Sequence, residues 1–362
     1  LGRTGLEVAD IGFGGSRLRG DEALVLHALE RGINYFDTAE GYTSGQSEVT
    51  LGRALAGERE RIILASKVHC GPSTSEGSLM TSLEESLSRL KTDRIDVYFN
   101  HAVNDVARLK NGAWGEFVEK AKQQGKIRFT GMSGHGGNLI PCIAYALDQG
   151  LVDVLLVAYN FGQDPSFYER FTKSFDFVAR QPDLPRVLRQ ARAKGVGIVA
   201  MKTLMGAKLN DMRPYEDGGA TYAQAAFRWV LNGGLVDNLV VTMKSTAQVD
   251  EYVGASGASA PDRAEERLLR RYAAAQANRQ CRYGCDVCLD SCPAGVPIAE
   301  VLRTRMYALD YEDPAFARSE YRGLSPDASA CLSCSERTCA GACSFGLPLS
   351  ELLPDTHRKL NG

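Results

Sequence analysis

The chain has 362 residues, and its hydrophobic fraction of 44% and charged fraction of 24% are ordinary for a soluble globular protein. Its formal net charge of −2 gives no electrostatic case for binding nucleic acid or an anionic membrane, and no apolar run approaches the roughly 18 residues of a membrane span. We therefore expect a cytoplasmic protein without a membrane span, although a chain that begins at Leu1 leaves a removed export leader open.

The first 255 residues alternate strand-like and helix-like segments. Short apolar runs bounded by turn residues predict strands at 11–15, 34–39, 61–68, 94–101, 126–134, 152–160, 196–202 and 237–244. The segments between them have helical spacing, as at 78–93, which repeats leucine every three or four residues. Eight strands, each followed by a helix-length segment, favour a closed parallel (β/α)8 TIM barrel over an open α/β sheet.

Two glycine-rich stretches imitate a dinucleotide-binding motif. In "GFGGSR", at 12–17, Arg17 stands where the third Gly or Ala should be. The glycines of "GVGIVA", at 195–200, open a predicted strand and do not precede a helix. Any nicotinamide cofactor must therefore bind in the mouth of a barrel and not in a Rossmann crevice.

Polar residues at the ends of three neighbouring strands form the candidate active site. In a barrel, chemistry takes place at the carboxyl ends of the strands, which here carry "FDTAEGY", "ASK" and "YFNH". Taken singly, each polar residue also has an ordinary structural role, and it is their joint occurrence that favours a site. The predicted catalytic residues are Asp37, Tyr42, Lys67 and His101.

These four residue types suit a site that protonates an oxygen while hydride arrives at carbon. A tyrosine has an ordinary pKa near 10, which a neighbouring ammonium lowers by stabilising the phenolate. A carboxylate paired with that ammonium keeps it charged and in place, and a histidine can orient the substrate oxygen. The set predicts carbonyl reduction or alcohol oxidation.

The motifs "LGRTGLEVADIGFGG", "NYFDTAEGY", "LASKV" and "DVYFNH" resemble the aldo-keto reductases, which are soluble NADP(H)-linked barrels. The resemblance covers residues 1 to about 255 and all four catalytic positions, and it implies that Tyr42 is the general acid. It also implies a set of cofactor-cleft residues, namely Ser133, Asn160, Lys202, Lys244, Ser245, Gln248 and Glu251.

Two departures from this family weaken the cofactor prediction. Many members hold the nicotinamide carboxamide with a Gln where this chain has Leu156, and many NADP-specific members carry an Arg in the last loop, where "STAQVDEY" has none. An Arg fork is the usual anchor for the 2′-phosphate. The choice between NADP(H) and NAD(H) thus stays open. The long aromatic stretch at 160–185 is expected to roof the pocket.

Eight of the ten cysteines lie in two runs, "CRYGCDVCLDSCP" from Cys281 and "CLSCSERTCAGAC" from Cys331. Disulfides suit small secreted domains, and structural zinc favours two separated CxxC pairs. Each run here instead has closely spaced cysteines with a fourth three residues further on, as in ferredoxins that hold [4Fe-4S] clusters. We favour two such clusters over zinc, and zinc over disulfides. Cys70 and Cys142 are interpreted as inert barrel residues.

In two-cluster ferredoxins the fourth cysteine of each run ligates the other cluster. Carried over, this rule implies two ligand sets: Cys281, Cys285, Cys288 and Cys343, and Cys331, Cys334, Cys339 and Cys292. The insert at 298–324 has helical spacing, so the domain resembles the α-helical ferredoxins, and its apolar residues are assigned to packing alone. The predicted domains are a barrel at 1–255, a charged helical linker at 256–280 and an iron–sulfur domain at 281–362.

This combination predicts an iron–sulfur oxidoreductase whose clusters relay electrons to or from a redox protein or other carrier. A nicotinamide delivers two electrons as hydride whereas a cluster passes one at a time, so direct exchange would need a converter such as a flavin, for which no motif is visible. The alternative is a non-catalytic or weakly catalytic docking and electron-transfer subunit. Hydride-linked catalysis is expected to take place wholly within the barrel mouth.

Overall fold

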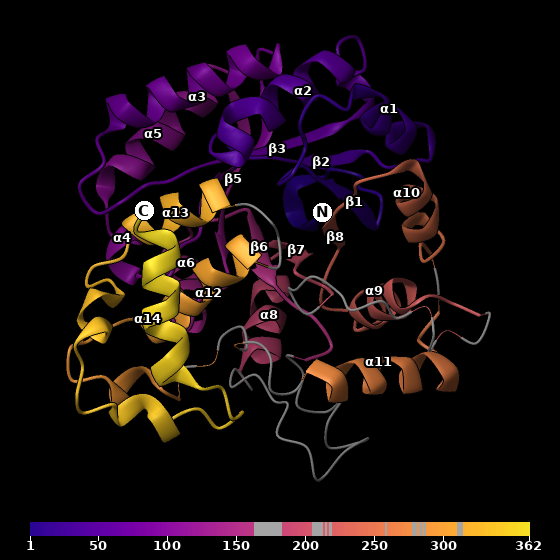
Figure 1. The fold of residues 1–362 in the computed structure, drawn as a ribbon. Helices are drawn as coiled ribbons and strands as arrows, with labels where there is room; N and C mark the ends of the chain where they lie inside the picture. The colour runs from indigo at the N-terminus through magenta and orange to yellow at the C-terminus, as the bar shows by residue number, and fades with distance from the viewer. Residues whose placement is uncertain are drawn as a thin grey trace.

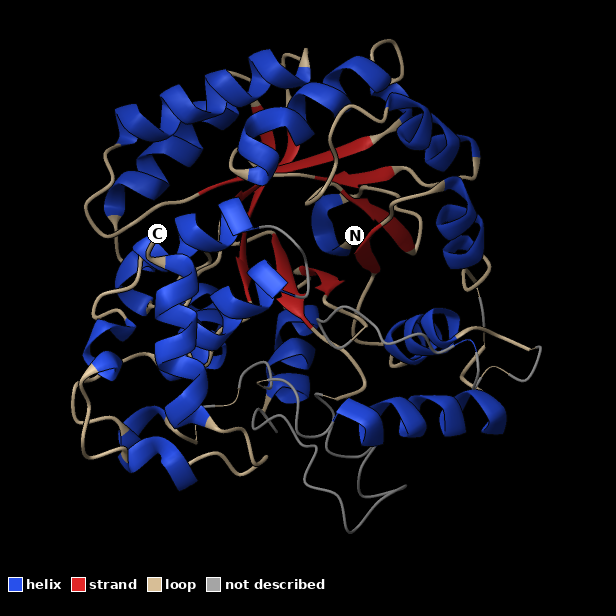
Figure 2. Cartoon of the chain, in the orientation of Figure 1, coloured by secondary structure: helices blue, strands red, loops and turns tan. Residues whose placement is uncertain are grey.

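The computed structural model describes residues 1–162, 183–204, 213, 216, 219–257, 259–276, 281, 285, 287–309 and 314–362. Eight parallel strands close into a barrel in sequence order, and β8 pairs with β1. The strands are β1 Ile11–Gly14, β2 Tyr35–Asp37, β3 Ile63–Val68, β4 Ile95–Asn100, β5 Ile127–Gly134, β6 Val154–Ala158, β7 Gly197–Met201 and β8 Asn238–Thr242. Each lies inside its predicted range, which confirms the (β/α)8 fold (Figures 1 and 2).

Helices surround this barrel in Figure 2. They are α1 Glu22–Glu30, α2 Gln46–Ala54, α3 Glu76–Leu90, α4 Val106–Leu109, α5 Gly112–Gln123, α6 Leu139–Asp148, α8 Leu184–Ala193, α9 Tyr222–Asn232 and α10 Thr246–Val253. The apolar stripe predicted in α3 is buried against the core. None of the helices described here has both the length and the apolar character that a membrane crossing needs.

The amino-terminal end of the barrel is closed by the first residues of the chain. The short helix η1 Gly2–Thr4 lies against the start of β7, where a Cβ added to Gly2 would meet the main-chain nitrogen of Gly197 at 2.3 Å. Gly2 also has a positive φ of 52°, a conformation that favours glycine. Access to the barrel interior is therefore from the carboxyl ends of the strands.

The segment predicted as a linker contains α11 Arg263–Gln276, which packs against the barrel helix α9. The ring centroids of Tyr272 and Tyr222 lie 4.3 Å apart, Tyr272 is fully buried, and Arg228 forms an ion pair with Glu265. A helix held by buried aromatic contacts and an ion pair is part of the packed structure, not a free tether.

The C-terminal part has its own hydrophobic core, built by α12 Ile298–Leu309, α13 Pro314–Arg322 and α14 Leu349–Leu360. The helical prediction for the insert at 298–324 is confirmed over α12 and α13, with 310–313 outside the described residues. Short 3-10 helices at Leu289–Ser291, Ala328–Leu332 and Thr338–Gly341 carry parts of the two cysteine runs. Figure 1 shows α12 and α13 next to β5 and β6, at the open end of the barrel.

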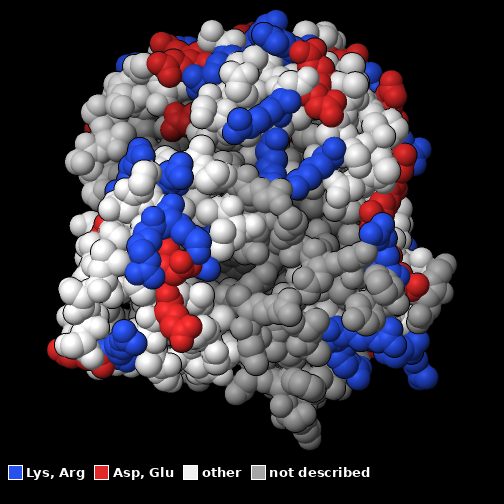
Figure 3. Space-filling view, in the orientation of Figure 1, with Lys and Arg blue, Asp and Glu red and all other residues white. Residues whose placement is uncertain are grey.

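Charged side chains of both signs are interspersed over the described surface in Figure 3, and Lys and Arg gather at the lower right, where Figure 1 places α11. Mixed charges agree with the small net charge of the chain.

Candidate active site

A cavity of about 380 Å³ opens at the carboxyl ends of the barrel strands. Every strand contributes to it at or just after its last residues, as a barrel active site requires. The strand-end residues that line the cavity are Gly14, Asp37, Lys67, His101, Ser133, Leu156, Met201 and Thr242. The four predicted catalytic residues are all among the lining residues.

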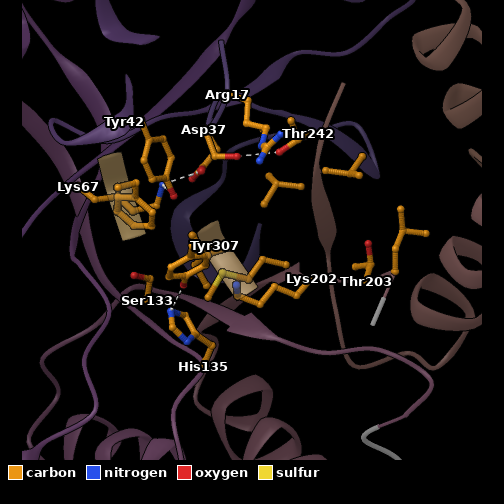
Figure 4. A pocket seen from close by; sticks show the side chains of 18 of the residues that line it. Arg17, Asp37, Tyr42, Lys67, Ser133, His135, Lys202, Thr203, Thr242 and Tyr307 are labelled. Atoms are coloured by element: carbon orange, nitrogen blue, oxygen red, sulfur yellow. Dashed lines mark hydrogen bonds and ion pairs between the residues drawn. The ribbon is translucent and has the colours of Figure 1, made fainter. Parts of the chain in front are cut away.

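Lys67 is the centre of the polar set (Figure 4). Its Nζ lies 2.6 Å from Oδ1 of Asp37 and 3.4 Å from Oη of Tyr42, and it also donates to the main-chain oxygen of Thr38 at 2.6 Å. Only 1% of Lys67 and 3% of Asp37 is exposed. A buried ammonium tied to one carboxylate and one carbonyl has a fixed position, so the phenol beside it is also fixed.

His101 completes the set from the end of β4. Its ring meets that of Tyr42 edge to face, with centroids 5.7 Å apart and an interplanar angle of 78°. Its main-chain nitrogen donates to the oxygen of Val68 at 2.8 Å, which holds the start of this loop against β3. Asp37, Tyr42, Lys67 and His101 are therefore brought together as predicted.

The electrostatics of Tyr42 differ from the sequence-based expectation. Burial, and then the carboxylate of Asp37, raise the pKa of Tyr42 well above 10, where the ammonium of Lys67 was expected to lower it. The ammonium is largely neutralised by its closer partner Asp37, so burial dominates. Burial also lowers the pKa of His101 well below 6.5, and Lys67 lowers it further. Tyr42 is thus a neutral phenol and His101 a neutral imidazole at neutral pH.

Burial shifts the pKa of both members of the ion pair that Asp37 and Lys67 form beside Tyr42. Burial raises the pKa of the Asp37 carboxyl and lowers the pKa of the Lys67 ammonium, and each partner opposes the shift of the other. Their 2.6 Å contact is what stabilises the two charges away from water. Replacement of either residue would leave the charge of the other buried without an opposite charge beside it.

Part of the predicted cofactor cleft lies in the same cavity, which Ser133, Leu156, Lys202, Lys244 and Gln248 line. Ser133 on β5 accepts a hydrogen bond from the nitrogen of Ala102 at 2.8 Å. Leu156 occupies the β6 position expected for it, with no polar group to offer a carboxamide. The described lining residues do not include Asn160, Ser245 or Glu251.

Those three residues have structural contacts. Asn160 donates to the main-chain oxygen of Lys202 at 3.1 Å and accepts from the nitrogen of Gly162 at 2.9 Å. Ser245 is the N-cap of α10, and the main-chain oxygen of Glu251 accepts from the side chain of Gln224. Most of the aromatic stretch at 160–185, expected to roof the pocket, lies outside the described residues.

Several lining residues were not predicted, and Arg17, His135, Tyr307 and Phe316 are among them. Arg17 follows β1 and His135 follows β5, so their positions at strand ends were the available signal. Tyr307 on α12 and Phe316 on α13 come from the C-terminal part, whose apolar residues were assigned to packing alone. Both residues do pack in or against the core of the C-terminal part, and in addition they line the cavity, a role that the sequence did not suggest.

The eight clustered cysteines fall into two neighbourhoods. Burial raises the pKa of Cys281 well above 9, and the thiols that raise it further are Cys285, Cys288 and Cys343. Burial raises the pKa of Cys331 to about 11, with further contributions from Cys292, Cys339 and Cys334. The members of these neighbourhoods coincide with the two groups that the ferredoxin pattern implies, and Cys339 of the second group also raises the pKa of Cys288 in the first.

All ten cysteines lie among the described residues, where no two of them are joined by a disulfide. Cysteines of both runs pack against the apolar core of the C-terminal part. Within the described residues, no three His, Cys, Asp or Glu side chains converge as a single metal ion would require. The disulfide interpretation of the two runs, the least favoured of the three, is not met in this structure.

Comparison with known proteins gives matches over most of the chain. A sequence profile described as "Aldo/keto reductase family" matches residues 10–215. L-Galactose dehydrogenase of Arabidopsis thaliana is 28% identical over 299 residues, which cover 70% of this chain and 86% of that protein. The profile match covers strands β1 to β7 of the barrel and all four predicted catalytic residues.

Solved structures share the fold. Aldo-keto reductase AKR11C1 from Bacillus halodurans, in its holo form, aligns with a TM-score of 0.59 at 25% identity, over 75% of this chain and 94% of that one. An aldo/keto reductase from Klebsiella pneumoniae in complex with NADP and acetate aligns with a TM-score of 0.57 at 23% identity, over 77% of this chain and 96% of that one. The second likeness concerns the fold alone.

Proposed function

The chain belongs to the aldo/keto reductase family and is an oxidoreductase, and from that premise we propose that it reduces a carbonyl group, or oxidises the corresponding alcohol, with NADP(H) or NAD(H). The observation that carries this proposal is the contact of one buried ammonium, that of Lys67, with both Asp37 and Tyr42 beside His101. The small-molecule substrate would bind in the cavity above these residues.

A bound nicotinamide would supply the hydride. In the direction of reduction, the carbonyl carbon gains that hydride and the carbonyl oxygen takes the proton from Oη of Tyr42, so that one alcohol forms for each reduced cofactor and proton consumed. A Tyr42 pKa well above 10 keeps the donor protonated until the oxygen gains charge. The neutral imidazole of His101 can donate a hydrogen bond to the same oxygen, and Lys67 stabilises the phenolate that remains.

Residues around the cavity fit a nicotinamide cofactor in part. Ser133 is a polar group at the end of β5, and Lys244 and Gln248 provide a cation and an amide at the β8 end. We keep Asn160, Ser245 and Glu251 as further candidates, although their side chains or main chains already have structural partners. Because segment 245–252 contains no Arg, we propose no preference between NADP(H) and NAD(H).

We also propose that the C-terminal cysteines hold two [4Fe-4S] clusters, one on Cys281, Cys285, Cys288 and Cys343, and one on Cys331, Cys334, Cys339 and Cys292. The support is the grouping of the thiols by their mutual influence on pKa and their apolar surroundings. A single ion with bonds of about 2.3 Å needs sulfurs within roughly 4 Å of each other. A four-iron cluster is larger and spaces its ligands more widely, and it is the group for which the spacing of the cysteines along the chain is typical.

Bound clusters would supply one-electron transfer. We propose that they relay electrons to or from a redox partner protein or a small carrier. We also propose that the chain is organised as a barrel at 1–255, a connecting segment at 256–280 and an iron–sulfur domain at 281–362. A flavin that converts two electrons to one stays an open alternative, since no motif for it is visible. The second candidate function, a weakly catalytic docking and electron-transfer subunit, is favoured by Leu156 in place of a carboxamide-binding side chain.

One titration separates the two functions. Anaerobically purified protein is titrated with NADPH and with NADH while the fluorescence of the nicotinamide is followed, and consumption of the reduced cofactor is then measured with a panel of carbonyls. A saturable fluorescence change followed by carbonyl-dependent oxidation of the cofactor supports the reductase. Absence of binding for both cofactors favours the docking subunit.

A further inference from the structure

We propose that Tyr307 and Phe316, two aromatic residues of the C-terminal part, form the substrate-selecting wall of the barrel's active site and favour planar, largely apolar carbonyl compounds. This inference rests on the carbonyl-reducing function proposed above and names its substrate class. It is carried by the contacts that α12 and α13 make with residues at the barrel mouth.

Phe316 lies directly against the proposed proton donor. Its ring meets that of Tyr42 edge to face, with centroids 6.3 Å apart and an interplanar angle of 86°. Both rings line the cavity. A carbonyl whose oxygen reaches Oη of Tyr42 must therefore pass beside the ring of Phe316, which is an apolar surface of fixed orientation.

Tyr307 extends this wall and fastens it to the barrel. Its ring centroid is 4.8 Å from that of Phe316, and its Oη lies 3.2 Å from Nε2 of His135, just after β5 (Figure 4). The Nζ of Lys202, at the end of β7, lies 4.9 Å from the centre of the Tyr307 ring. One aromatic side chain from α12 thus contacts the mouth at two barrel strands.

Ion pairs hold the two helices in this position. Arg303 on α12 donates to Glu300 at 2.7 Å and to Glu320 on α13 at 3.2 Å, and its side chain is only 11% exposed. Glu300 in turn accepts from Asn104, in the loop after β4, at 3.1 Å. Paired and largely buried charges of this kind fix relative position, so the aromatic wall is a built part of the site.

The chemistry of the cavity indicates the substrate class. Tyr42 and His101 lie together and can both donate a hydrogen bond to the carbonyl oxygen of a substrate. Leu156 on β6 and Met201 on β7 add apolar surface to the cavity. Arg17, Lys244 and Gln248 add polar groups on the β1 and β8 side of the cavity, so selection by shape and apolar contact comes from the side that Tyr307 and Phe316 line. A flat aromatic aldehyde or ketone gains from such a wall, whereas a small hydrated dicarbonyl does not.

The test uses the full-length protein with intact C-terminal part and two probe carbonyls, 4-nitrobenzaldehyde and methylglyoxal. Variants are Phe316→Leu, which removes the aromatic ring beside Tyr42, and Tyr307→Phe, which keeps the ring but removes the hydrogen bonds of its hydroxyl with His135 and Arg303. The matched control is Tyr321→Phe: Tyr321 is also a buried tyrosine of the C-terminal part, bonded to His357 at 2.8 Å, and it does not line the cavity.

We expect the wild type to prefer 4-nitrobenzaldehyde in kcat/KM, and Phe316→Leu to lower that preference about fivefold, as the loss of one aromatic contact implies. Tyr307→Phe should raise KM for both carbonyls severalfold with kcat nearly unchanged, because it loosens the wall and leaves Tyr42 intact. Tyr321→Phe should change neither quantity. The inference would be overturned if Phe316→Leu and Tyr307→Phe both kept the wild-type preference for 4-nitrobenzaldehyde and the wild-type KM for both carbonyls.

A binding measurement separates this inference from the proposed function. Calorimetry with 4-nitrobenzyl alcohol reports on contact with the wall without any turnover. If the wild type reduces no carbonyl, yet Phe316→Leu weakens binding of the alcohol about fivefold and Tyr321→Phe does not, the proposed reaction fails while the aromatic wall stands. Equal affinity in the wild type and Phe316→Leu would contradict the wall itself.

Discussion

The ammonium of Lys67 lies 2.6 Å from the carboxylate of Asp37 and 3.4 Å from the phenol of Tyr42, so one buried cation contacts both residues. The three side chains come from the ends of β2 and β3 and from the loop between β2 and α2. Because the contact with Asp37 is the shorter one, the cation is held chiefly by the carboxylate and serves the phenol from a fixed position.

Replacement of Lys67 tests this arrangement. Lys67→Met should lower the free energy of unfolding by about 3–5 kcal/mol, since it leaves the carboxylate of Asp37 buried without a partner. The double variant with Asp37→Asn should recover most of that loss without recovering carbonyl reduction. The measurement is urea unfolding followed by the fluorescence of Trp114 and Trp229, both in barrel helices. A single variant as stable as the double one would contradict the coupling.

Acid should destabilise the barrel through two buried histidines. Burial lowers the pKa of both His101 and His135 well below 6.5. The unfolded chain therefore binds more protons below about pH 6.5, and the free energy of unfolding falls as the pH drops, by up to about 1.4 kcal/mol per pH unit for each histidine. Urea unfolding at pH 7 and pH 5.5 should show a smaller fall for His135→Asn than for the wild type. An unchanged pH dependence would show that His135 titrates alike in both states.

Iron content tests the proposed clusters. Protein purified without air should absorb broadly near 400 nm and contain about eight iron atoms per chain if both clusters assemble. Cys142→Ser, which alters a buried thiol of the barrel helix α6, should keep this iron content, whereas Cys334→Ser should lower it. Stoichiometric zinc without iron, in protein never exposed to air, would contradict the cluster assignment.

Loss of one cluster ligand should affect both halves of the molecule. Cys288→Ser should abolish reduction driven by a one-electron donor such as reduced viologen, if the clusters relay electrons. It should also raise KM for the carbonyl in the nicotinamide-linked reaction, because Tyr307 and Phe316 lie between the two cysteine runs and depend on the folded C-terminal part. Steady-state assays with each donor separate the two effects. A wild type that exchanges no electrons with viologen would leave the clusters a structural role.

The barrel and its polar set follow from local sequence patterns. Parallel strands bring their carboxyl ends together, so Asp37, Lys67 and His101 had to meet once the strands were located. The position of α12 at the barrel mouth, in contrast, does not follow from local sequence patterns. No local pattern tells where a helix between two cysteine runs will pack, and Tyr307 and Phe316 resemble ordinary core residues in sequence. The pKa of Tyr42 likewise depends on burial, which three-dimensional packing decides.

The same limit applies to α11. Its charged sequence resembles a solvated connector, yet Tyr272 is fully buried against Tyr222 on α9. The charge pattern correctly indicated a helix and missed the face that packs. A helix that buries Leu268, Leu269 and Tyr272 among many charged residues differs little in sequence from a solvated helix until its neighbour is known.

Replacement of Tyr42 by Phe tests the central claim most directly. Tyr42→Phe removes the proton donor and little else, so carbonyl reduction should fall by about a thousandfold or more while the affinity for NADPH or NADH, from nicotinamide fluorescence, stays within about twofold. Tyr98→Phe, a buried tyrosine of β4 outside the cavity lining, should behave like the wild type. If Tyr42→Phe reduces a good carbonyl substrate at the wild-type rate, Tyr42 is not the acid and the proposed site is wrong.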